Sequence, residues 1–179
     1  MSTDNAVKKA HPIAFSFIIL FSFIEFLITT ILISNYNSDN SYYSDSLRDR
    51  LKFLLFTSIW SLVFTSIYLF GIFKLPTNFL FSLASHAGFL FITWIFWLSG
   101  AAALSDTLSG LSCGDLFLSD VRINVGIRYC HSLKAVQAFA WIEWITLSFV
   151  LAYIALIASR AVKAGTGLKS PMREVPAAV

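Results

Sequence analysis

Charged residues are scarce in this chain of 179 amino acids: only 13% are Asp, Glu, Lys or Arg, against about 25% in soluble globular proteins. The net charge of +3 is small, and the basic residues are not clustered as nucleic-acid-binding proteins require. The chain also lacks a Gly-rich phosphate loop and the His-Glu-x-x-His and Gly-x-Ser-x-Gly motifs. We therefore expect no enzyme, no catalytic residue, no metal or cofactor site and no nucleic-acid partner.

Hydrophobic residues make up 57% of the chain, and they fall into four long runs. The runs cover residues 12–34, 51–73, 79–104 and 135–158, and each exceeds the ~20 residues that cross a bilayer as a helix. The first is too long for the apolar region of a signal peptide. The sequence thus predicts an all-α fold, a bundle of four transmembrane helices over residues 12–160, with polar tails at 1–11 and 161–179.

The links between the runs differ in length. Residues 74–78 form a very short link with Pro76, which makes the second and third helices antiparallel neighbours. Four spans put both tails on one side of the membrane. With the tails in the cytosol, that side carries seven basic residues and the other side six, a difference too small to orient the bundle by the positive-inside rule.

The two cysteines, Cys113 and Cys130, share the loop over residues 105–133. A disulfide between them would close a loop of about 17 residues, worth roughly 3 kcal/mol in the chain-entropy model. Because disulfides persist on the oxidising side of a membrane, a bridge would place this loop outside and both tails in the cytosol. The alternative is a pair of free thiols in a cytosolic loop.

Two acidic residues lie inside the apolar runs, Glu25 in the first and Glu143 in the fourth. Each is nine residues from the same face of the bundle, or about 13 Å deep at 1.5 Å per residue. If these helices are neighbours, the two carboxyl groups share a layer, and at least one is protonated near neutral pH. They could form a proton or cation site. Alternatively, they are neutral groups that hydrogen-bond to Ser22, Thr29 or Thr146 and hold helices together.

Other residues of the spans carry weaker signals. His86 enters the third span about 10 Å from its end, a different layer from the two acids, and we expect a neutral side chain near Ala84, Ser85 or Gly88. The small residues Gly100, Ala101, Ala102 and Ala103 predict a close helix crossing. The tryptophans at 94, 97, 141 and 144 indicate either interfacial anchoring or an aromatic contact between the third and fourth spans.

These features together resemble the fungal branch of the MARVEL-domain membrane proteins. The resemblance rests on Phe96 to Leu104 (FWLSGAAAL), on the loop with Cys113 and Cys130, and on Ala138 to Trp144 (AFAWIEW). The order of a medium, a very short and a longer loop also agrees. The resemblance implies an M-shaped four-helix bundle with cytosolic termini, and roles in membrane apposition, vesicle traffic and lipid microdomains. It implies no catalytic residue.

The sequence therefore predicts a non-enzymatic integral membrane protein that organises membranes through helix packing and lipid contact. Expected partners are membrane lipids, sterols and sphingolipids among them, and other membrane proteins or further copies of the chain. The plasma membrane or secretory vesicles are the expected location. The alternative is a small proton-coupled transporter or channel that uses Glu25 and Glu143.

Overall fold

The computed structural model describes residues 3–40, 42, 44–74, 83–109, 116–118, 121–123 and 129–163. They form four long helices, α1 (Thr3–Asp39), α2 (Asp45–Lys74), α3 (Leu83–Leu108) and α4 (Cys130–Lys163). Two short antiparallel strands, β1 (Leu116–Leu118) and β2 (Val121–Ile123), lie between α3 and α4, with Phe117 opposite Arg122.

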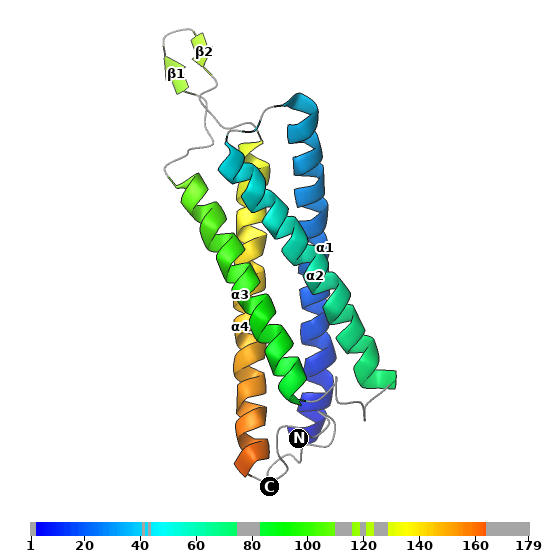
Figure 1. Cartoon of the computed structure of the whole chain (residues 1–179). Helices are drawn as coiled ribbons and strands as arrows, with labels where there is room; N and C mark the ends of the chain where they lie inside the picture. Colours follow the sequence, from blue (N-terminus) through cyan, green and yellow to red (C-terminus); the bar gives the residue numbers. More distant parts are fainter. Residues whose placement is uncertain are drawn as a thin grey trace.

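The four helices form an up-down bundle in which each packs on two neighbours (Figure 1). Helix α1 lies against α2 and α4, and α3 lies against the same two helices. The start of α1 and the end of α4 lie at one end of the bundle, and the hairpin projects at the other end. The prediction that the second and third spans are antiparallel neighbours is confirmed. The first span also packs against the fourth, which was the condition for Glu25 and Glu143 to share a layer.

Each helix contains a stretch that is long and apolar enough to cross a membrane: Ile13–Asp39, Asp45–Gly71, Ala84–Leu108 and Cys130–Leu156. The predicted all-α, four-helix membrane fold is thus confirmed. Apart from the start of the third span, whose residues 79–82 lie outside the described residues, the helices extend beyond the predicted spans, because a helix can continue after its apolar run ends. The loop predicted at 105–133 is shortened at both ends and contains the unpredicted hairpin. Residues 75–78 of the predicted link and 164–179 of the predicted tail lie outside the described residues.

Local chemistry explains the boundary between α1 and α2. Asn40, directly after α1, has a φ of 47°, the left-handed conformation that commonly ends a helix and that Asn tolerates better than most residues. Ser44 precedes α2, and its Oγ accepts a hydrogen bond from the backbone N–H of Leu47 at 3.1 Å. This is the N-cap arrangement, which satisfies an N–H group that has no partner within the helix.

On two helices, from Phe15 on α1 and from Leu133 on α4, the buried positions alternate between spacings of three and four residues. On α1 they are Phe15, Ile18, Ser22, Glu25, Thr29, Leu32 and Tyr36. On α4 they are Leu133, Val136, Ala140, Glu143, Leu147, Val150 and Ile154. This spacing averages 3.5 residues, which keeps one stripe of each helix facing its neighbours in a left-handed bundle.

Candidate functional site

The interior of the bundle contains polar side chains, whereas its outer surface is largely apolar. Among the described residues, buried polar or charged side chains lie on all four helices: Ser22, Glu25, Thr29, Thr57, Ser58, Ser61, Thr65, His86, Thr93 and Glu143. The outward surface carries large apolar side chains, for example Phe17 and Phe23 on α1, Phe70 on α2 and Phe149 on α4. Lipid is as apolar as these side chains, so polar groups turn inward, where other helices can satisfy them.

Glu25 and Glu143 meet in this interior, and neither side chain is exposed (0% for both). Ser22, almost one turn before Glu25 on α1, donates a hydrogen bond to Oε1 of Glu143 on α4. The two carboxyl groups are close enough to interact electrostatically. Both oxygens of Glu25 and Oε2 of Glu143 have no hydrogen-bond partner among the described residues. The fold therefore brings together two acids from opposite ends of the chain, with only one of four carboxyl oxygens hydrogen-bonded.

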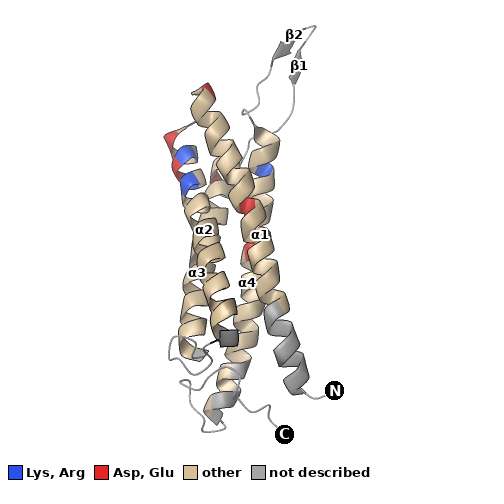
Figure 2. Ribbon diagram, turned by 90° about the vertical axis from the view of Figure 1, so that its right-hand side faces the viewer, with Lys and Arg blue, Asp and Glu red and all other residues tan. Residues whose placement is uncertain are grey.

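The basic residues whose side chains the structure describes, Arg48, Arg50, Lys52 and Lys134, are not buried, so none of these four is a buried partner for either acid. Figure 2 shows the described basic residues near the end of the bundle at which the hairpin lies, whereas acidic residues also occur further along the bundle. An unpaired buried carboxylate is strongly unfavourable in low dielectric. The arrangement is therefore stable only when a proton or another cation neutralises this acid pair.

His86 lies in a separate, aromatic environment. Its ring is 1% exposed and stacks on Phe15 of α1, with centroids 5.0 Å apart. Tyr68 of α2 contacts the same ring edge-on, also at 5.0 Å. The sequence predicted only small neighbours at 84, 85 or 88 and did not indicate these two aromatic contacts. Gly88 is exposed on the outer surface of α3.

Four of the five tryptophans donate indole hydrogen bonds to a hydroxyl group on a neighbouring helix. The pairs are Trp60–Thr93 at 3.2 Å, Trp97–Ser61 at 2.9 Å, Trp94–Ser148 at 2.7 Å and Trp141–Ser105 at 3.0 Å. Each accepting hydroxyl also donates to the backbone carbonyl four residues earlier on its own helix. One hydroxyl thus satisfies a carbonyl and an indole together, which joins α2 to α3 and α3 to α4.

Sequence reasoning did not find these four hydroxyl groups. Ser and Thr occur throughout the spans, and only the rotation of each helix decides which of them meets an indole. The tryptophans were the feature of the sequence that could have indicated these hydrogen bonds. An aromatic contact between the third and fourth spans, one of the two interpretations of the tryptophans, is present: the ring centroids of Trp94 and Trp144 are 5.7 Å apart. Trp141 contacts Trp144 within α4, at 5.4 Å. Trp97 instead faces α2.

The small-residue segment of α3 lies against α2 at one position in particular. A Cβ atom added to Gly100 would stand 2.5 Å from Cδ2 and 3.2 Å from Cγ of Leu54, so only glycine fits without a shift. Ala101 is also buried, and Ala103 is partly buried. Ala102 is exposed, which corrects the prediction that all four residues pack at a crossing. The reason is helical rotation: two residues beyond Gly100, a side chain points to the opposite face.

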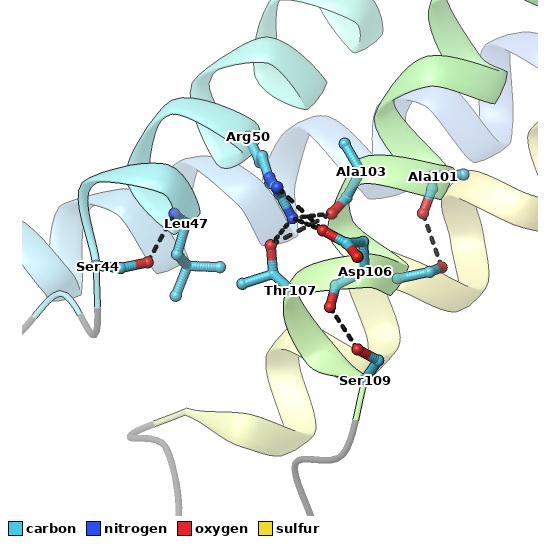
Figure 3. A network of polar contacts seen from close by, with 9 residues as sticks. Ser44, Leu47, Arg50, Ala101, Ala103, Asp106, Thr107 and Ser109 are labelled. Carbon is cyan, nitrogen blue, oxygen red and sulfur yellow. Dashed lines mark hydrogen bonds and ion pairs between the residues drawn. The ribbon is translucent and has the colours of Figure 1, made fainter.

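Arg50 connects α2 to the last turns of α3 near the hairpin end (Figure 3). Its guanidinium donates to Oδ2 of Asp106 from two nitrogens, each at 3.3 Å. It also donates to the Thr107 hydroxyl and to the carbonyl of Ala103. Asp106 is 78% exposed, so the ion pair alone contributes little, whereas the carbonyl and hydroxyl contacts are partly buried.

Tyrosines close the same end of the bundle between α1 and α4. Tyr36 contacts Tyr42 at 4.9 Å and Tyr129 at 5.3 Å between ring centroids. Tyr129 donates to Oδ2 of Asp39 at 2.7 Å. Partial burial raises the pKa of Tyr42, with an opposing contribution from Arg48, and its phenol donates to Asn37 at 3.0 Å.

Of the two cysteines, the structure describes one. Cys130 is the first residue of α4 and is buried. Cys113 lies outside the described residues, so the bridge between them stays a prediction.

A comparison with protein families gives one match. A family model described as "MARVEL: Membrane-associating domain" matches residues 9–154, which is most of the chain and includes the larger part of every helix. No match was found among curated proteins or among solved structures.

Proposed function

The chain belongs to the MARVEL family of membrane-associating domains, and we propose that it is a non-enzymatic protein that organises lipid microdomains. The observation that carries the proposal is the outward surface of the bundle. On all four helices this surface presents Phe, Ile, Leu or Val side chains that are 40% exposed or more, and such a surface is suited to contact with acyl chains.

The outward surface also has a shape that lipids can distinguish. Phe149 on α4 is 74% exposed and Phe70 on α2 is 69% exposed, so bulky rings project from the bundle. Elsewhere the outward surface has small residues, including the exposed Gly88 and Ala102 on α3. Rigid planar sterols and saturated chains pack differently from unsaturated chains against a surface with both bulky and small residues. We infer that sterols and sphingolipids are the preferred neighbours, and that the plasma membrane or secretory vesicles are the site of action.

The direct test is reconstitution of the full chain into giant vesicles with coexisting sterol-rich and sterol-poor phases. We expect the fluorescently labelled protein to concentrate in one phase and to change the size of its domains. The double variant Phe70→Ala, Phe149→Ala should lose much of this preference, since it removes the two most exposed rings. Thr30→Ala, on the outward surface of α1, is the matched control. Equal distribution of the parent protein between the phases, with unchanged domains, would contradict the proposal.

The proposal also covers the branch of the family, the orientation of the chain in the membrane and the cellular process. We place the chain in the fungal branch of the family and assign both termini to the cytosol, as the predicted disulfide in the loop between α3 and α4 also requires. We propose that the protein organises lipids in membrane apposition and vesicle traffic. It would act alone, as several copies or together with other membrane proteins.

A small proton-coupled transporter is the second candidate, and the buried pair Glu25 and Glu143 is the observation that favours it. The two functions differ in a measurable way. A transporter reconstituted in vesicles would carry a proton flux that Glu25→Gln with Glu143→Gln abolishes, whereas a lipid organiser has no such flux. In the double variant of an organiser, the distribution between lipid phases should stay unchanged, because Gln retains a donor and an acceptor in the same volume.

A further inference from the structure

We propose that Glu25 and Glu143, together with Ser22, form a binding site for one small monovalent cation, a proton or a sodium ion, between α1 and α4. The site goes beyond the organising function proposed above, since a membrane organiser can exist with or without it. It is built from three fully buried side chains on two helices that are in contact.

Three of the four carboxyl oxygens of the pair have no hydrogen-bond partner among the described residues. Ser22 donates to Oε1 of Glu143, which leaves Oε2 of Glu143 and both oxygens of Glu25 without a hydrogen bond among the described residues. Thr29, one turn after Glu25 on the same buried stripe, also has a hydroxyl oxygen without a partner. Buried polar groups that only hold helices together are normally satisfied. Oxygen atoms that are buried, close and unsatisfied are the ligands that a proton or a hard cation takes.

The negative charge of the two carboxyl groups also favours a bound cation. Glu25 and Glu143 are near enough to interact, and two buried carboxylates without a counter-charge repel each other. One cation bound between them leaves at most a single negative charge, and one cation with one protonated acid leaves none. Neutrality inside the membrane thus requires that the pair bind positive charge.

The buried side chains that α2 and α3 direct into the interior near the pair are uncharged. Helix α2 contributes the uncharged Ser58 and Ser61 to the interior, and α3 contributes Thr93 and Trp97. Among the buried side chains of the described residues, the other acid–base groups are His86 and Tyr36. His86 stacks on Phe15, which is about 15 Å from Glu25 along α1, and Tyr36 is a similar distance away in the other direction.

The experiment measures the thermal unfolding midpoint Tm of the full chain in detergent. One series varies pH, and another replaces choline chloride by sodium chloride or potassium chloride at constant ionic strength. A ligand that binds only the folded state stabilises it in proportion to the logarithm of its concentration above the dissociation constant. For one site in a chain of this size, each tenfold increase should raise Tm by roughly 3–6 °C.

The variants are Glu25→Gln, Glu143→Gln and the pair of them, with Asp49→Asn, an exposed acid on α2, as the control. We expect the response of the parent to be lost in the double Gln variant and kept in the Asp49 control. A proton site responds to falling pH and not to sodium. A sodium site responds to sodium more than to potassium or choline.

A second measurement covers the case in which the double variant does not fold. Dicyclohexylcarbodiimide, a hydrophobic carbodiimide, reacts with protonated carboxyl groups in apolar surroundings, and mass spectrometry locates the modified residue. In the parent protein, labelling of Glu25 or Glu143 should fall as pH rises for a proton site, and should fall on addition of sodium for a sodium site. The proposal is overturned if the parent shows neither a Tm response that the double variant lacks nor labelling that changes with pH or sodium.

Discussion

Trp97 on α3 donates its indole N–H to the hydroxyl of Ser61 on α2 at 2.9 Å, and both side chains are completely buried. The same hydroxyl donates to the carbonyl of Thr57 at 2.9 Å. Lipid is itself apolar, so the hydrophobic effect does not drive helices together inside a membrane. They associate through close packing and through hydrogen bonds of this kind.

Replacing Trp97 by Phe should destabilise the bundle, beyond the effect of the lost ring volume, by about 0.6 kcal/mol and at most about 1.7 kcal/mol, the average and the maximum for hydrogen bonds between membrane helices. A double-mutant cycle with Ser61→Ala isolates the hydrogen bond, measured by reversible unfolding in mixed micelles. Trp144→Phe is the matched control, because the Trp144 indole nitrogen has no hydrogen-bond partner among the described residues. A coupling energy near zero between positions 61 and 97 would show that packing alone holds this contact.

Gly100→Leu should cost about 1–3 kcal/mol through overpacking, since even a Cβ would stand 2.5 Å from Leu54. Gly88→Leu should be nearly neutral or slightly stabilising, because nothing lies within 4 Å of a Cβ at that position and glycine is a poor helix former. The measurement is thermal stability in detergent. Adding Leu54→Ala to Gly100→Leu should restore part of the loss. Equal stability of the two glycine variants would place the segment around Gly100 against lipid.

Arg50→Ala should destabilise the bundle more than Asp106→Asn does. The arginine also satisfies the Ala103 carbonyl and the Thr107 hydroxyl, whereas Asp106 is largely exposed. For Asp106→Asn we expect about 0–1 kcal/mol, a loss that shrinks as salt is added. Unfolding of both variants at low and high salt measures the difference. If the two variants lose equal stability, the ion pair, and not the hydrogen bonds to the end of α3, carries the contact.

The predicted bridge between Cys113 and Cys130 gives a test of orientation. With an outer disulfide, a membrane-impermeant maleimide should label intact cells only after a reductant is added. The single variant Cys113→Ser leaves one thiol and should allow labelling without a reductant, provided that Cys130, which is buried, becomes accessible. Labelling of the parent without a reductant would exclude the bridge. Labelling that requires permeabilised cells would reverse the topology.

The sequence alone determined the class of the protein. Four runs of apolar residues, each long enough to cross hydrocarbon, allow no other backbone structure than helices with internal hydrogen bonds. The short link at 74–78 determined that the second and third helices are antiparallel neighbours. Depth along the helix also follows from sequence, which is why Glu25 and Glu143 could be assigned to a common level before any packing was known.

Only the tertiary structure decided which side chains meet. Helix rotation places Ala102 on the outside and Gly100 against Leu54, although both are small residues of one segment. It also directs His86 to two aromatic rings. Sequence order does not encode such rotations directly, because most positions of these spans are apolar and an apolar side chain is equally stable against lipid or protein. The polar positions help to fix the rotation, and several of their partners lie on other helices, where no local sequence pattern identifies them.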